Sequence, residues 1–237
     1  MLVAGLCGSA LAAAQAGFYP AWGLNGAPQA QMLTSSVLMQ RVVNHRLGSR
    51  SSGLGSNVAA PAVKPATATA AGPLTFSPGP RPIAPARLAS GYALDVRTEA
   101  EATFDRMLDA YHQIERQFDL PRNDLGGALA AFVAGNVMAY HDRPFPDRLF
   151  KPLVQQMRAA IGVTGAFDDT APAEKQELYE SLAILGMFMA ATREAVRTQS
   201  DPTLAAKVRT AARGTLQRTL RLDPDRVQLT ERGLTVD

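Results

Sequence analysis

The chain has 237 residues, a net charge of +3, one cysteine and an aromatic content of only 6%. Ala, Leu and Met are abundant and β-branched residues form no strand-like runs, so the composition favours helices over sheets. The composition also argues against nucleic-acid binding, because Lys and Arg do not cluster with aromatic side chains, and against disulfides or Cys-ligated zinc.

Residues 1–16 have the character of a removable export signal. They are apolar or small and end in Ala14-Gln15-Ala16, whose small side chains suit a signal peptidase, although no Lys or Arg precedes the run. Because Cys7 lies inside this stretch, the mature chain would carry no thiol. The run is too short to span a bilayer as a helix. We therefore expect an exported protein, periplasmic or secreted, with no transmembrane helix in its mature chain.

Residues 17–91 are basic, because this stretch holds six Lys or Arg residues and no acidic residue. Residues 17–47 form an N-terminal segment with room for one short helix, whereas residues 48–91 are rich in Pro and Ala and lack a periodic apolar face. Such a composition cannot offset its ordering entropy, so 48–91 is predicted to be a disordered linker. We expect this basic tail to attract an anionic envelope surface, such as phospholipid or cell-wall polymer.

Residues 92–237 are predicted to form an all-α domain, a bundle of about five helices, because apolar residues recur at helical spacing. The first helix is expected to begin at a Thr98–Glu101 capping box and to run to about Phe118. The second is expected to run to about Tyr140 from a cap on Asn123 or Asp124. Its glycines are expected to let a neighbouring element approach closely; they are Gly126, Gly127 and Gly135.

Three further helices follow. One spans about residues 146–161, where Pro152 either kinks the helix or marks its true start. The next spans 172–198, and its middle, 181–192, is apolar nearly all round, which is typical of a central helix.

The fifth helix is predicted to begin at a cap on Ser200 or Asp201, followed by Pro202, and to end near Leu222. Beyond it, Val227 and Leu229 alternate with polar residues. We expect this C-terminal tail to lie extended on the bundle.

Three polar residues fall on faces that are otherwise apolar: Glu115, Asn136 and Arg193. Because a buried charge needs a partner, we expect Glu115 to accept a hydrogen bond from Arg193, with Asn136 bridging or satisfying a helix end. The favoured interpretation is a structural network that fixes helix register. The alternative is a polar pocket for a small ligand.

No metal, cofactor or catalytic site is predicted. Asp109 and His112 lie three residues apart, as do Glu177 and Glu180, but all four are expected to face solvent and to lack the rest of a ligand set. Nucleophile-elbow, phosphate-loop, dinucleotide and metalloprotease motifs do not occur.

Three segments resemble a family of bacterial exported proteins that is defined only as a domain of unknown function: 123–147, 175–189 and 220–234. The features that carry the resemblance are Asn123, Asn136, the Tyr179–Met189 stretch and Leu222-Asp223-Pro224. The resemblance covers about residues 92–236. It implies those domain limits and no activity.

Two functions remain open on these grounds. The first is a non-enzymatic exported interaction or structural protein of the cell envelope. The alternative is a small-ligand-binding helical bundle with its polar site at Glu115, Asn136 and Arg193. A hydrolase or metalloenzyme is disfavoured, because no motif supports either.

Overall fold

The computed structural model describes residues 74–164, 167–221 and 223–236. This part of the chain is mostly helical, with about six helices packed together, which confirms the predicted all-α class. The predicted export signal, the 17–47 segment and residues 48–73 of the predicted linker lie outside the described residues. The helices are α4 (Ala84–Ala89), α5 (Arg97–Gln117), α6 (Leu125–His141), α7 (Phe150–Thr164), α8 (Pro172–Gln199) and α9 (Pro202–Leu220).

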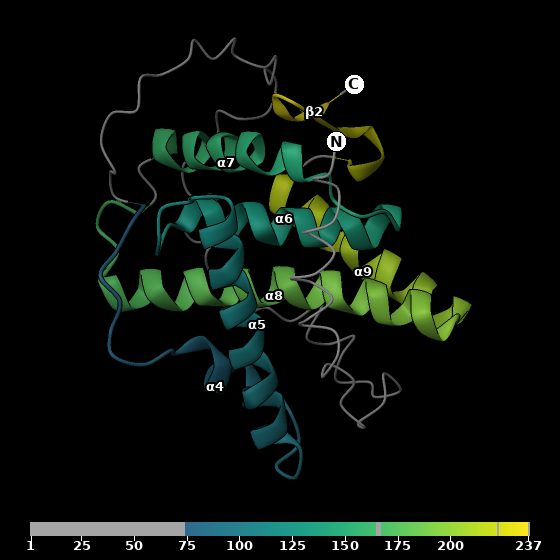
Figure 1. Cartoon of the computed structure of the whole chain (residues 1–237), viewed down its shortest axis with the longest axis horizontal. Coiled ribbons are helices and arrows are strands. Elements are labelled where there is room, and N and C mark those ends of the chain that lie inside the picture. The colour runs from purple at the N-terminus through teal and green to yellow at the C-terminus, as the bar shows by residue number, and fades with distance from the viewer. Residues whose placement is uncertain (1–73, 165–166, 222, 237) are drawn as a thin grey trace.

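Helix α6 lies at the centre of the fold, between α7 and α8 (Figure 1). Helix α5 crosses α8 steeply, with α4 packed beside it, and α9 contacts both α6 and α8. The middle of α8 is buried over residues 181–187, which confirms its predicted central position. Most of the hydrophobic core comes from α6 and α8 and from the face of α5 that meets them.

Glycines bring α6 and α8 into backbone contact. A Cβ atom on Gly135 would lie 2.1 Å from the carbonyl oxygen of Gly186, and one on Gly186 would lie 2.5 Å from that of Ala131. On the other side of α6, a Cβ atom on Gly126 would lie 2.2 Å from Cγ of Arg158 in α7. The predicted close approach at the α6 glycines is therefore confirmed.

Two helix starts resolve questions that the sequence left open or answered wrongly. Helix α5 begins at Arg97 after Val96, and no side chain caps it, so the predicted Thr98–Glu101 capping box is wrong. A backbone turn from Ala93 to Val96 leads into the helix instead. Helix α7 begins at Phe150, which puts Pro152 in its first turn, where a missing N–H costs no helical hydrogen bond. The proline therefore marks the start of the helix.

Residues 74–91 belong to the folded domain, so the prediction of a disordered linker reaching residue 91 is wrong for this part. Leu74, Ala84 and Ala89 are buried in the core. The backbone N–H groups of Ile83 and Ala84 both donate to one carboxylate oxygen of Glu180 in α8, at 2.6 and 2.8 Å. These contacts satisfy the start of α4, and they offset the ordering entropy that the composition alone could not.

The C-terminal residues form an antiparallel hairpin on α7. The turn η4 (Pro224–Arg226) leads into strand β1 (Val227–Thr230), which pairs with β2 (Gly233–Val236). The side-chain amide of Gln156 in α7 donates to the carbonyl of Leu234 and accepts from its N–H, at 2.7 and 2.6 Å. The tail is thus extended on the bundle as expected, with a strand pairing that the sequence analysis did not predict.

Among the described helices, none combines the length and the apolar character that crossing a bilayer requires.

Candidate functional site

The turn between α8 and α9 folds these two helices back against each other. Ser200 adopts the left-handed conformation, with φ 54°, and its N–H donates to the Val196 carbonyl, which ends α8. Asp201 then caps α9 by accepting a hydrogen bond from the Leu204 N–H at 2.9 Å, which confirms the predicted cap. As a result, Val196 of α8 and Val208 of α9 share one small apolar cluster.

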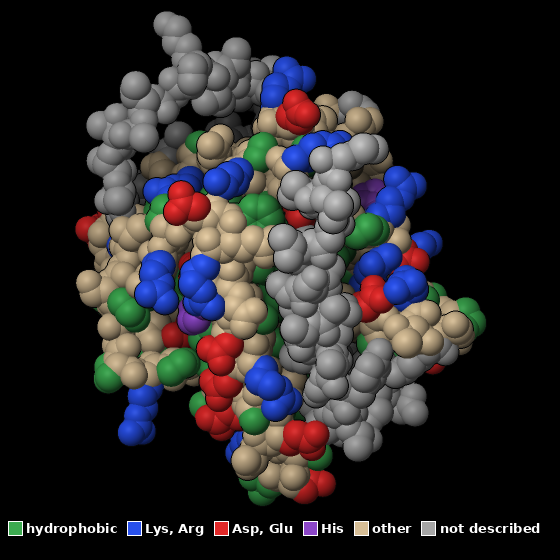
Figure 2. All heavy atoms as spheres, in the orientation of Figure 1, with side chains coloured by type: hydrophobic (Ala, Val, Ile, Leu, Met, Phe, Trp, Pro, Cys, Tyr) green, Lys and Arg blue, Asp and Glu red, His purple; other side chains and the backbone are tan. Residues whose placement is uncertain are grey.

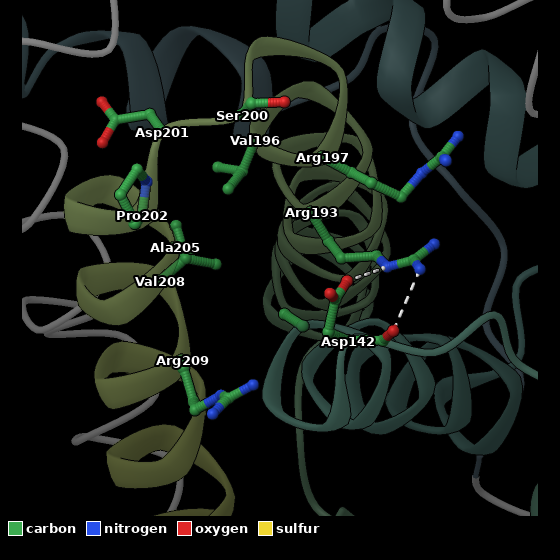
Figure 3. Close-up of a pocket in the computed structure, with 11 residues that line it drawn as sticks. Asp142, Arg193, Val196, Arg197, Ser200, Asp201, Pro202, Ala205, Val208 and Arg209 are labelled. Carbon is green, nitrogen blue, oxygen red and sulfur yellow. Dashed lines mark hydrogen bonds and ion pairs between the residues drawn. The ribbon is translucent and has the colours of Figure 1, made fainter.

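A groove of about 360 Å³ opens where this turn meets the C-terminal end of α6 (Figure 3). Apolar side chains from three helices line it: Ala139 of α6, Val196 of α8, and Pro202, Ala205 and Val208 of α9. Ser200 and five charged side chains complete the lining; the charged residues are Asp142, Arg193, Arg197, Asp201 and Arg209. The groove therefore places apolar surface beside guanidinium groups.

Arg193 joins the C-terminal end of α6 to α8. Its Nε donates to the Asp142 carboxylate at 2.9 Å, and its Nη2 donates to the Asp142 carbonyl at 3.1 Å. Its Nη1 donates to Glu194 at 3.3 Å. The Arg193 side chain is only 11% exposed, so these contacts hold it in one position at the edge of the groove. Its role here is to fix the groove wall.

The other two arginines of the groove differ in their partners. Arg197 donates to the Glu194 carboxylate at 2.5 and 3.2 Å, and this hydrogen bond lowers the pKa of Glu194. Arg209 is exposed and makes no ion pair with any side chain in the described part of the chain. Its guanidinium group is therefore the one at this groove that is available to a bound anion.

Glu115, Asn136 and Arg193 do not form the predicted network, because each has a different partner. Glu115 is 2% exposed and accepts a hydrogen bond from the Tyr179 hydroxyl at 2.7 Å. The expected Glu115–Arg193 contact is wrong: α5 meets α8 near Tyr179, whereas Arg193 lies almost four turns further along α8, at the end of α6. Burial raises the pKa of Glu115 to about 7.

Asn136 makes a hydrogen bond within its own helix. It is 1% exposed, and its Nδ2 donates to the Phe132 carbonyl at 2.8 Å. Its Oδ1 finds no hydrogen-bond partner among the described residues. Asn136 lies next to Gly135, where α6 and α8 pack closely. It does not line the groove.

Three residues of the two pairs considered as metal ligands make contacts within the fold. Glu180 is buried, 4% exposed, so the expectation that it faces solvent is wrong; it caps the start of α4 instead. Glu177 pairs with Arg87 at 2.9 Å, and the His112 ring stacks on Tyr179. Across the described ranges, no three His, Cys, Asp or Glu side chains come together as metal ligands.

Acidic charge gathers elsewhere on the molecule. Figure 2 shows carboxylates over the N-terminal part of α5, whose first thirteen residues, 97–109, carry Glu99, Glu101, Asp105 and Asp109. Burial, followed by the neighbouring Glu101 and Asp109, raises the pKa of Asp105. The region of α5 is thus unfavourable for anions, in contrast to the groove at α9.

Sequence reasoning found Arg193 but missed the rest of the groove. Arg193 stood out because it flanks an apolar arc of its helix. Arg209 gave no such signal, because a charged residue on one face of an amphipathic helix is ordinary. The predicted cap before Pro202 did indicate a turn between the two helices. A turn alone does not specify the volume of the groove between them.

The profile of a family of unknown function, DUF6683, matches residues 3–237. The match extends well beyond the 92–236 limits that the resemblance implied, so the N-terminal residues are part of what the family shares. No curated protein and no solved structure matches the chain. The chain therefore belongs to the DUF6683 family.

Proposed function

We propose that this protein is a non-enzymatic binding protein whose groove between α6, α8 and α9 takes a small molecule with an apolar body. The observation that carries the proposal is the groove itself, about 360 Å³ with apolar side chains from three helices. Ligand sites commonly measure roughly 300–1,000 Å³ and combine an apolar lining with few polar groups, so this groove suits a small ligand.

Two features support this proposal over simple imperfect packing. The walls are held by specific contacts, since Arg193 fixes the end of α6 against α8 and Asp201 fixes the start of α9. The apolar residues Val196 and Val208 are 8% and 4% exposed and pack in one cluster, so the apolar floor of the groove is held in place. The sequence-based alternative of a ligand site thus keeps Arg193 and loses Glu115 and Asn136.

Hexanol is a suitable first probe, because it has a short hydrocarbon chain and no charge. Titration of the full chain, followed by amide chemical shifts, should move the signals of Val196, Ala205 and Val208 with an affinity in about the millimolar range. Ala205→Phe should fill the groove and abolish these shifts. Ala206→Phe is the matched control, since Ala206 is exposed on the same helix and does not line the groove.

The proposal fails if hexanol leaves these amides unchanged in the wild-type protein. It fails equally if the Ala205→Phe and Ala206→Phe variants bind the probe alike, because binding would then lie elsewhere.

We also propose that the protein works outside the cytoplasm, in contact with the cell envelope. The apolar stretch 1–16 and the acid-free basic stretch 17–73 support this. Expression of the full chain in a bacterium should give a mature protein that begins at Gly17 and associates with the envelope in a salt-sensitive way. Deleting 17–73 should release it, and the deletion should stop there, since 74–91 pack on α8.

Two results would count against this second proposal. One is recovery of the uncut chain from the cytoplasm. The other is envelope association that survives the deletion or is insensitive to salt.

A further inference from the structure

The charges around the groove are satisfied unequally. Both carboxylates of its lining are engaged: Asp142 by Arg193, and Asp201 by the N–H of Leu204 at the start of α9. Glu194, next to the groove, accepts from Arg193 and Arg197. Among the described residues, no acidic group of the lining forms an ion pair with Arg209.

Arg209 lies one helical turn beyond Ala205 on α9, on the side that faces the apolar lining. Figure 3 shows its side chain extending from α9 toward the groove. Burial, then Arg143 and Arg209, lower the pKa of the neighbouring His141 against the opposing effect of Asp225. Arg209 thus lies close enough to His141 to disfavour the charged form of that ring.

We propose that Arg209 is the residue that determines ligand specificity, and that it selects small molecules with a carboxylate at the end of a short apolar chain. This inference rests on the proposed function, because it concerns the same groove. The hydrocarbon part lies against Val196, Ala205 and Val208, and the carboxylate accepts hydrogen bonds from the Arg209 guanidinium group. Arginine suits this role, since its planar donors match the two oxygens of a carboxylate.

The chemistry of the groove favours an anion over a neutral or cationic ligand. A cationic end group would meet three arginines against two carboxylates of the lining, of which Asp142 is already paired with Arg193. A neutral hydroxyl group would gain only an ordinary hydrogen bond, and hydrogen bonds between charged groups are about twice as strong as neutral ones. The acidic α5 region, which would repel the same ligand, lies away from the groove (Figures 1 and 2).

The test compares hexanoate with hexanol, two probes that differ mainly in the charged end group. Dissociation constants come from the amide shifts of the groove residues in the full chain. The wild-type protein should bind hexanoate about five- to ten-fold more tightly than hexanol. Raised ionic strength should weaken only the hexanoate, because Arg209 is exposed and its charge is screened by salt.

Arg209→Gln should remove this preference by weakening hexanoate alone. Arg218→Gln is the matched control, because Arg218 lies exposed on the same helix, makes no ion pair with a described residue and does not line the groove. It changes the net charge equally and should leave both affinities as in the wild type. Both variants replace exposed side chains, so their thermal unfolding should match that of the wild type.

The outcomes separate the inference from the function on which it rests. If neither probe shifts the groove amides, the proposed function fails and takes the inference with it. If both probes bind the wild type equally, or if Arg209→Gln weakens them equally, the inference alone is overturned. If Arg218→Gln abolishes the preference as well, the selection comes from net charge and Arg209 is not its source.

Discussion

Helix α8 meets α6 and α9 in two contrasting ways. Against α6, Gly186 and Gly135 remove both side chains, and the two backbones touch. Against α9, Val196, Ala205 and Val208 keep the helices apart, and a groove of about 360 Å³ remains. The same helix thus forms a closed contact along its middle and an open one at its C-terminal end, which separates the part that holds the fold from the part that can bind.

The largest expected effect comes from closing the space that the glycines leave. Gly186→Ala would put a Cβ atom 2.5 Å from the Ala131 carbonyl oxygen, and backbone atoms on both helices cannot yield. We expect the free energy of unfolding to fall by at least about 3 kcal/mol. Denaturant titration measures this. Gly162→Ala in α7 is the control: its Cβ atom would meet no atom within 4 Å, so it should stabilise by about 0.5–1 kcal/mol.

Equal losses in the two glycine variants would contradict the comparison, because they would mean that the α6–α8 contact tolerates a methyl group.

The second prediction concerns pH and the buried end of α5. Burial raises the pKa of Glu115 from 4.5 to about 7, so the folded state retains a proton that the unfolded state releases. The stability that this group contributes is complete below its unfolded pKa and is lost as the pH rises toward 7. The loss amounts to at most about 3 kcal/mol.

Glu115→Gln isolates this effect, because the amide oxygen can still accept the hydrogen bond from Tyr179. Relative to wild type, the variant should be more stable at about pH 8 and equally stable at about pH 4. The comparison also removes the opposite effect of His112, whose pKa is lowered by burial. A difference between the two proteins that does not change with pH would rule out this account of Glu115.

A smaller effect is expected where residues 74–91 dock on α8. Glu180→Ala leaves the N–H groups of Ile83 and Ala84 without their acceptor and should cost about 2 kcal/mol. The rate of amide hydrogen exchange should rise first in α4. Glu177→Ala is the control: the Glu177 side chain is 13% exposed but pairs with Arg87, which is 58% exposed, so the loss should stay at about 1 kcal/mol and below that of Glu180→Ala. Unchanged exchange in α4 of Glu180→Ala would mean that this carboxylate does not hold the segment.

The smallest effect on stability is expected at the open end. Arg193→Gln removes the contacts to Asp142 and should cost about 1 kcal/mol, because the Asp142 side chain is exposed. Hexanol binding should weaken with it, since the end of α6 is then free to move relative to α8. Undiminished binding would show that the groove wall does not depend on Arg193.

The sequence predicted features of single helices and their close contacts better than it predicted the groove. Local signals predicted both helix starts to within one residue, and the structure shows that the caps are Asp124 and Asp201. They also predicted the close approach at Gly126 and Gly135. The Thr98–Glu101 match failed because the backbone turn before Val96 starts the helix two residues earlier. Helical periodicity describes one helix at a time, so it identified Glu180 as polar but could not show that the start of α4 covers it.

Helical periodicity could not predict the groove either. Its volume depends on how far α9 stands from α6, and that distance is set by contacts between helices far apart in sequence. Arg193 was correctly singled out as a polar residue that needs a partner. The partner, Asp142, could not be predicted, because it follows the end of α6 in a left-handed conformation that the sequence does not mark.

The most direct test of the binding proposal is a measurement of where a bound probe lies. Nuclear Overhauser effects between hexanoate and the protein should be recorded on the full chain at saturating probe. Our account predicts contacts from the hydrocarbon chain to the methyl groups of Val196, Ala205 and Val208. Contacts confined to any other surface, or none at saturation, would contradict it.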